Sequence, residues 1–130
     1  MITLALRTDK PEAELYLYRD GKKLAEIKWP AHRQLAETLN SQIQQILDKS
    51  SISYDELEGI AVYKGPGSFT GLRIGLSVAN ALAYAQKIPI AAAGGEDWLK
   101  QGLGALKDGA SDKVAIPEYG AEANITKPRK

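Results

Sequence analysis

Glycines at a strand–helix junction limit what this 130-residue chain can fold into. The motif Gly65-Pro66-Gly67-Ser68 interrupts the chain between an apolar run at 59–63 and a helical pattern over 70–86. Glycine supplies backbone conformations that other residues avoid, and Ser68 or Thr70 can accept hydrogen bonds from the free N–H groups of a helix start. The pattern therefore predicts a strand, a sharp turn and a helix in succession.

Such a junction is also a place where phosphates bind, so Gly65, Gly67 and Ser68 are candidate cofactor-binding residues. Two known templates fail here. The P-loop needs Lys and then Ser or Thr after its last glycine, and Leu72-Arg73 stand there instead. The dinucleotide-binding fingerprint needs a third glycine where Thr70 stands. We therefore favour a turn and a helix cap over a phosphate cradle, and we expect no cofactor.

Small residues recur four apart along the predicted helix, at Gly71, Gly75, Ala79 and Ala83. A glycine inside a helix costs about 1 kcal/mol relative to alanine, so this stripe indicates the close approach of another backbone. Two neighbours fit this requirement: the chain's own helix predicted over 35–47, and a helix of another chain. Val78 is expected on the opposite side of the helix, facing the sheet.

The other segments predict a mixed α/β sheet. Alternating apolar residues and the hairpin signal Asp20-Gly21 indicate strands, and apolar residues at helical spacing indicate helices. In chain order these are strands at 2–7, 13–18 and 24–29, a helix over 35–47, a strand at 88–91 and a helix over 96–103. Three antiparallel strands followed by βαβα predict one actin-like or ribonuclease H-like lobe, with five strands and helices on the faces of the sheet.

The composition changes after residue 103, where glycine, proline and serine become frequent. We therefore predict a lobe over 1–103 and a short, breaker-rich tail over 104–130. Three cations near the end, Lys127, Arg129 and Lys130, offer a contact to RNA phosphates. A charged end of this kind is more often a solvated tail, so direct contact with tRNA stays open.

The residue counts exclude several kinds of chemistry. The chain has no cysteine and one histidine, His32, so thiol catalysis, disulfides and two-histidine zinc sites are excluded within it. A net charge of +1 argues against a generally nucleic-acid-binding surface. There is no signal-peptide pattern and no apolar run of membrane-spanning length, so we expect a cytoplasmic protein with no membrane contact and no metal.

The eleven residues Gly65-Pro66-Gly67-Ser68-Phe69-Thr70-Gly71-Leu72-Arg73-Ile74-Gly75 resemble the signature of the bacterial TsaB (YeaZ) family. The surroundings agree in order, with Asp20-Gly21-Lys22 in a hairpin and Ile88-Pro89 after the long helix. The family comprises glycoprotease-like, actin-fold subunits of the machinery that makes threonylcarbamoyladenosine (t6A) in tRNA. Its members usually carry a second lobe, so the resemblance implies a shortened, one-lobe version in which the tail takes that lobe's place.

The opening turn departs from the family pattern. Arg7-Thr8-Asp9 stand where the family has Asp-Thr-Ser, the position of a metal-directed aspartate in actin-like ATPases. Arginine cannot act as a carboxylate ligand or as a base. The resemblance therefore implies no catalytic residue, no ATP hydrolysis by this chain and a subunit that is not itself an enzyme.

The resemblance implies a scaffold that binds and activates the threonylcarbamoyl transferase subunit TsaD, and that serves as a platform for the small ATPase TsaE. The pairing would use two helices, at 33–47 and 70–86. The partner-binding residues expected on them are Leu35, Leu39, Ile43, Phe69, Gly71, Leu72, Arg73, Gly75, Leu76, Ala79 and Ala83. Two alternatives stay open: a homodimer through the same helices, and a nucleotide-binding actin-like protein that uses the glycine turn.

Overall fold

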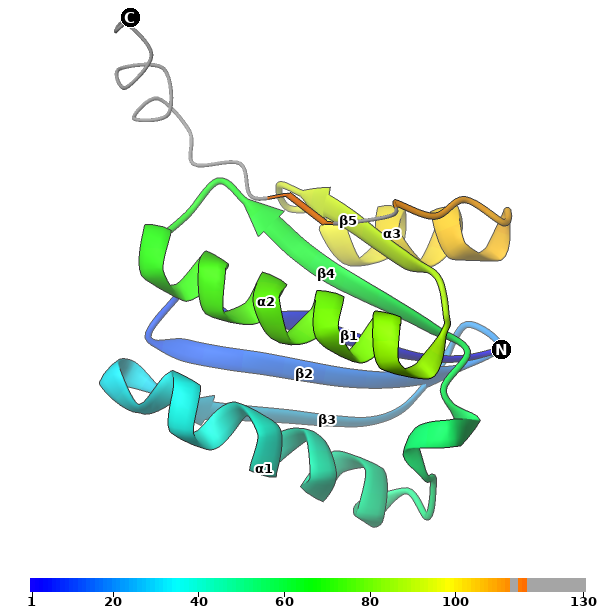
Figure 1. Cartoon of the computed structure of the whole chain (residues 1–130), viewed down its shortest axis with the longest axis horizontal. Coiled ribbons are helices and arrows are strands. Elements are labelled where there is room, and N and C mark those ends of the chain that lie inside the picture. Colours follow the sequence, from blue (N-terminus) through cyan, green and yellow to red (C-terminus); the bar gives the residue numbers. More distant parts are fainter. Residues whose placement is uncertain (113–114, 117–130) are drawn as a thin grey trace, which may run out of the picture.

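One mixed sheet organises the chain in a computed structural model that describes residues 1–112 and 115–116 (Figure 1). The sheet holds five strands in the order β3-β2-β1-β4-β5. In chain order the strands are β1 (Ile2–Arg7), β2 (Glu12–Arg19), β3 (Lys22–Pro30), β4 (Gly59–Gly65) and β5 (Ile90–Gly94). The helices are α1 (Leu35–Lys49), α2 (Phe69–Gln86) and α3 (Trp98–Lys107), with one-turn 3-10 helices at His32–Gln34 and Tyr54–Glu56.

The central strand, β1, pairs antiparallel with β2 and parallel with β4. Strands β2 and β3 form an antiparallel hairpin, and β4 pairs parallel with β5. The hairpin turns at Asp20 and Gly21, which both adopt positive φ (51° and 82°), as a tight two-residue connection requires. The predicted mixed five-stranded sheet, three antiparallel strands followed by βαβα, is confirmed.

The helices cover the sheet from both sides, with α1 and α2 on one face and α3 on the other (Figure 1). Gly59 of β4 faces the side of the sheet that α3 covers, because a Cβ placed there would lie 3.3 Å from the side chain of Leu106 in α3. Thr3 is the register partner of Gly59, so the next residue of β1, Leu4, points to the α1 and α2 side. The fully buried leucines of β1 and β2 form the layer beneath these two helices: Leu4, Leu6, Leu15 and Leu17.

Helix α3 ends later than predicted, at Lys107 instead of residue 103. Its close packing on β4 explains the extension, because Leu106 is 2% exposed and covers Gly59. The predicted tail therefore begins inside this helix. The cations Lys127, Arg129 and Lys130, for which contact with RNA was left open, lie outside the described residues.

The predicted stripe of small residues on α2 packs against the chain's own sheet. Gly75, Ala79 and Ala83 are all buried. A Cβ at Gly75 would lie 2.0 Å from Oγ1 of Thr8, and a Cβ at Gly71 would lie 2.1 Å from the Thr8 carbonyl oxygen. The two glycines therefore let α2 approach the end of β1 more closely than any other residue type allows. The neighbour of both glycines is the β1–β2 connection, not α1.

The β1–β2 connection is itself built to receive the helix. Thr8 is 3% exposed, and its hydroxyl donates a 2.7 Å hydrogen bond to the carbonyl oxygen of Gly71. One residue further on, Asp9 lies beneath the glycine turn, where a Cβ at Gly67 would come within 2.5 Å of Asp9 Oδ2. Three glycines of the motif therefore accommodate two consecutive residues, Thr8 and Asp9.

The predicted orientation of Val78 is wrong. Val78 is half-buried and lines surface pockets with Ile43 of α1 and Ser77, and it does not face the sheet. The reason is that the stripe containing Gly75 fills the space over β1. Helix α2 is therefore rotated, relative to the prediction, so that Val78 lies on its outer side beside α1.

We expect Gly75→Ala to lower the free energy of unfolding by about 1–3 kcal/mol, because the added methyl group overlaps Thr8. Denaturant-induced unfolding measures the change. Gly104→Ala is the matched control, because it lies in α3 and has open space at its Cβ. This control should be neutral or stabilising by up to about 1 kcal/mol. Equal stability of Gly75→Ala and the unmodified chain would contradict the packing described above.

The overlap can be assigned to Thr8 by a double-mutant cycle. Thr8→Ala removes Oγ1, the atom nearest the added methyl group, together with Cγ2. The double variant Thr8→Ala/Gly75→Ala should therefore lose less stability than the sum of the single variants, with a coupling of about 0.5–3 kcal/mol. Additive losses would show that the added methyl group disturbs another contact.

Candidate functional site

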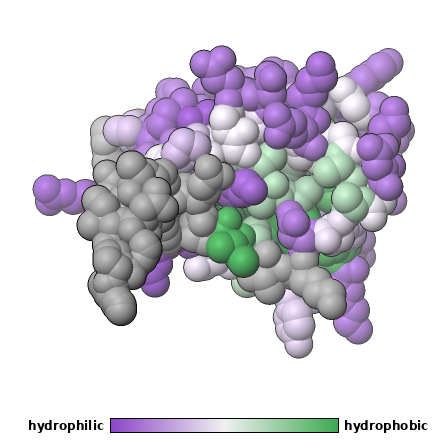
Figure 2. All heavy atoms as spheres, turned by 90° about the horizontal axis from the view of Figure 1, so that it is seen from above, coloured by the Kyte–Doolittle hydropathy of each residue, from purple (hydrophilic) through white to green (hydrophobic). Residues whose placement is uncertain are grey.

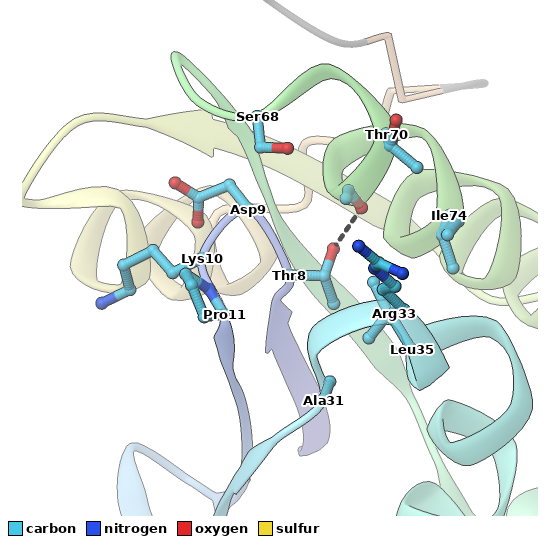
Figure 3. Close-up of a pocket in the computed structure, with 11 residues that line it drawn as sticks. Thr8, Asp9, Lys10, Pro11, Ala31, Arg33, Leu35, Ser68, Thr70 and Ile74 are labelled. Atoms are coloured by element: carbon cyan, nitrogen blue, oxygen red, sulfur yellow. Dashed lines mark hydrogen bonds between the residues drawn. The ribbon is translucent and has the colours of Figure 1, made fainter.

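A cavity of about 580 Å³ opens where the β1–β2 connection meets the start of α2 (Figure 3). Three parts of the chain contribute: the β1–β2 connection, the segment from the end of β3 into α1, and the first turns of α2. Its lining residues are Thr8, Asp9, Lys10, Pro11, Ala31, Arg33, Leu35, Ser68, Thr70, Gly71 and Ile74.

The one carboxylate in this lining is held by an arginine. Arg7 donates to both oxygens of Asp9, from Nε to Oδ1 at 2.7 Å and from a terminal nitrogen to Oδ2 at 3.3 Å. The Arg7 guanidinium also stacks 3.9 Å from the ring centre of Tyr63. Burial is the largest single influence on Arg7 and lowers its pKa, but the hydrogen bond and charge of Asp9, together with Tyr63 and Glu14, raise the pKa of Arg7 on balance. The negative charge of Asp9 is therefore paired with the positive charge of Arg7 in the same chain.

The two cationic residues that line the cavity, Lys10 and Arg33, lie in different surroundings. Lys10 forms a 2.8 Å ion pair with Glu14, whose side chain also accepts a 2.7 Å hydrogen bond from the Tyr16 hydroxyl. Burial alone would raise the pKa of Glu14, but these two bonds lower it. Arg33 is exposed and lines the cavity (Figure 3). The cavity therefore presents one solvated cation beside the first N–H groups of α2, an arrangement that favours anions.

The three candidate cofactor-binding residues, Gly65, Gly67 and Ser68, have different surroundings in the structure and do not line the cavity together. Gly65 ends β4 with a φ of 122°, and its carbonyl oxygen accepts a 3.3 Å hydrogen bond from the N–H of Gly95. Gly67 packs on Asp9, and Ser68 alone lines the cavity. Ser68 is the N-cap residue of α2 but makes no side-chain capping bond, and Thr70 lies inside the helix, so the predicted side-chain cap by Ser68 or Thr70 is wrong.

A second concave surface runs between α1 and α2, and we call it the α1–α2 groove. It consists of two adjoining pockets of about 380 and 390 Å³ that share Ser77 and Val78. Arg73 is the one charged residue in its lining, and it lies 5.3 Å from the ring centre of Phe69. The lining residues are Ala36, Asn40, Ile43, Tyr54, Phe69, Thr70, Arg73, Ile74, Ser77, Val78, Ala81 and Leu82.

The predicted partner-binding residues fall into three groups. Phe69, which is 55% exposed, Arg73 and Ile43 line the groove. Gly71 is half-buried against Thr8. The others are buried within the chain's own core and present little surface: Leu35, Leu39, Leu72, Gly75, Leu76, Ala79 and Ala83.

Sequence reasoning missed the outer face of α2. Ser77, Ala81 and Ala85 are exposed and form a second series spaced four apart. Ile74 and Val78 flank this series on the groove side. Tyr84, which is 88% exposed, was missed as well. The spacing alone is not a sufficient signal, because the buried stripe and the exposed series both recur every four residues.

Two classes of site are not formed by the part of the chain that the structure describes. None of the helices described is both long and apolar enough to cross a membrane. Within residues 1–112 and 115–116, no group of three or more histidine, aspartate or glutamate side chains is placed to hold a metal ion.

Comparison with known proteins identifies relatives over most of this structure. The family model of TsaD, tRNA N6-adenosine threonylcarbamoyltransferase, matches residues 29–93, which is half of the chain. The tRNA N6-adenosine threonylcarbamoyltransferase of Trichlorobacter lovleyi is 32% identical over 106 residues, covering 69% of this chain and 31% of the relative. The tRNA threonylcarbamoyladenosine biosynthesis protein TsaB of Escherichia coli is 32% identical over 90 residues, covering 69% and 38%.

Solved structures give the same assignment. YeaZ from Pseudomonas aeruginosa superposes with a TM-score of 0.70 at 29% identity, covering 83% of this chain and 50% of YeaZ. RuvC from Thermus thermophilus shares the fold alone, with a TM-score of 0.51 at 14% identity over 72% of this chain and 64% of RuvC. The predicted ribonuclease H-like or actin-like lobe is confirmed.

This chain spans about a third of the curated relatives' length and half of YeaZ. The matched region runs from the end of β3 to β5, so it includes α1, the glycine motif and α2. The resemblance carried by residues 65–75 is thereby confirmed, and the chain belongs to the family of TsaD and its homologue TsaB (YeaZ).

Proposed function

We propose that this lobe is a non-catalytic scaffold that binds and activates the transferase subunit TsaD in t6A modification of tRNA. The α1–α2 groove is the binding surface, and it is the single observation on which the proposal depends. The homology to TsaB, a t6A biosynthesis protein in Escherichia coli, supports a role in t6A biosynthesis. TsaE is a further proposed partner of the assembled complex.

The shape of the groove favours a helix as its occupant. The exposed series Ser77, Ala81 and Ala85 carries almost no side-chain bulk, so a partner helix can approach α2 closely. Apolar side chains on the α1 side, among them Val78 and Leu82, add contact area that is withdrawn from water on binding. The exposed ring of Phe69 is a suitable anchor at the start of the groove, since aromatic residues dominate interface energies.

The cavity near the glycine motif supports a non-catalytic role. The resemblance to the TsaB family places Arg7 where actin-like ATPases carry an aspartate. In the structure Arg7 binds both oxygens of Asp9. Both oxygens of this carboxylate are already hydrogen-bonded to a guanidinium of the same chain. We therefore assign the chemistry of the modification to the partner subunit.

We expect Ala81→Arg to weaken binding to TsaD at least tenfold, which corresponds to about 1.4 kcal/mol. The arginine would place a charge and bulk in the middle of the groove, and Ala81 is exposed, so the fold should survive. Isothermal titration with the transferase of the same organism measures the affinity. Gln101→Arg adds the same charge on α3, on the opposite face of the sheet, and should leave the affinity unchanged.

Unchanged affinity of Ala81→Arg would remove the groove from the proposal. A substitution at Gly75 would not be a clean test, because it disturbs the contact with Thr8 and hence folding. The homodimer alternative uses the same surface, so light scattering of the chain alone decides it. A dimer that Ala81→Arg converts to monomer would show that the groove can pair with a second copy.

Nucleotide binding is a second candidate function, favoured by the exposed Arg33 at a cavity beside the first turn of α2. If the lobe is only a scaffold, titration with ATP and magnesium should show no binding tighter than about 100 μM. Tighter binding that Arg33→Ala abolishes would establish the nucleotide function. Arg73→Ala is the matched control, because Arg73 lines the groove and not this cavity.

A further inference from the structure

The two edges of the sheet are protected in different ways. Edge strand β3 carries the charged residues Lys22, Lys23, Glu26 and Lys28. Charged side chains on an edge strand discourage pairing with another chain. The opposite edge, β5, reads Ile-Ala-Ala-Ala-Gly and has no charge at all. This edge therefore needs another form of protection.

The free edge of β5 can be identified from the pairing. The carbonyl oxygen of Pro89 accepts a 3.0 Å hydrogen bond from the N–H of Ile60 on β4. Since successive residues of a strand direct their backbone groups to opposite sides, Ala91 and Ala93 also face β4. The backbone groups of Ile90 and Ala92 then face outward, where the sheet ends.

The chain that follows α3 returns and bonds to these outward groups. The N–H of Asp112 donates to the carbonyl oxygen of Ile90 at 2.7 Å. The N–H of Ile90 donates to Oγ of Ser111 at 3.3 Å, and the N–H of Ala92 donates to Oδ2 of Asp112 at 2.8 Å. Two of the three bonds use side chains in place of the backbone groups of a sixth strand.

Helix α2 holds the returning segment a few residues further on. The side-chain amide of Asn80 makes two hydrogen bonds to Ala115, accepting from its N–H at 2.8 Å and donating to its carbonyl oxygen at 3.0 Å. Ala115 is 3% exposed, so this contact is shielded from water. An amide side chain that both donates and accepts imitates the backbone of a strand partner.

We propose that Ser111, Asp112 and Ala115 act as a strap that protects the β5 edge and so prevents this edge from pairing with a second copy of the chain. The face that includes this edge is the one seen from above in Figure 2, where green, hydrophobic surface gathers toward the middle and purple, hydrophilic residues form much of the margin. The inference does not depend on TsaD binding, because it concerns the edge of the sheet and not the α1–α2 groove.

Residue-resolved hydrogen exchange by NMR tests the strap on the full chain. Asp112→Ala should accelerate exchange of the Ala92 amide by about tenfold or more, because the bond to Oδ2 is lost. Exchange at Ala91 and Ala93, which face β4, should not change. Asp112→Asn keeps an acceptor oxygen and should restore most of the protection. Asp108→Ala removes an exposed acid just after α3 and should have no effect on Ala92.

Two results would overturn the strap. An Ala92 amide that exchanges at the same rate in Asp112→Ala and in the unmodified chain would show that Asp112 does not protect the edge. Equal acceleration at Ala91, Ala92 and Ala93 would show that the variant loosens the whole strand.

Sedimentation tests the second part of the proposal. The variant Asn80→Leu/Asp112→Ala lacks the bonds to both Ala115 and Ala92 and should self-associate in a concentration-dependent way. The further substitution Ala92→Pro removes an outward N–H and should reverse that association. Self-association that persists in the Ala92→Pro background, or a double variant that sediments like the unmodified chain, would overturn the role in preventing edge pairing.

Discussion

The contact between Thr8 and the two glycines of α2 sets the distance between helix and sheet. Thr8 is held by its own hydrogen bond to Gly71, and neither Gly71 nor Gly75 has room for a Cβ. Because a helix is rigid, its depth at the first two turns determines its depth along the rest of its length. The burial of Ala79 and Ala83 follows from that contact.

This packing changes the meaning of the glycine motif. In a strand–turn–helix junction, glycines are commonly read as a cradle for phosphate. Here Gly67, Gly71 and Gly75 adjoin Thr8 and Asp9 of the same chain, so they serve the fold. What remains for a partner is the opposite side of α2, where Ser77 and Ala81 are exposed beside α1.

Helix α2 is thus the element that connects the features of this lobe. One flank receives the β1–β2 connection, the outer face borders the groove, and Asn80 holds the segment that covers β5. A change in the position of α2 would therefore alter the contact with the β1–β2 connection, the shape of the groove and the cover of the β5 edge. The Arg7–Asp9 pair lies next to the start of this helix and neutralises a charge that would otherwise face the cavity.

The sequence by itself determined the element order, the hairpin and the family. Alternation in β2 and β3 and the Asp20-Gly21 turn are local signals that local hydrogen bonding and sterics are sufficient to interpret. The residue 65–75 motif identified the family through its resemblance to the TsaB signature. Of the predicted partner-binding residues, Phe69, Arg73 and Ile43 line the groove. The tertiary structure alone decided which side of α2 is buried. The stripes containing Gly75 and Ala81 have the same spacing, and only contact with Thr8, distant in sequence, distinguishes them.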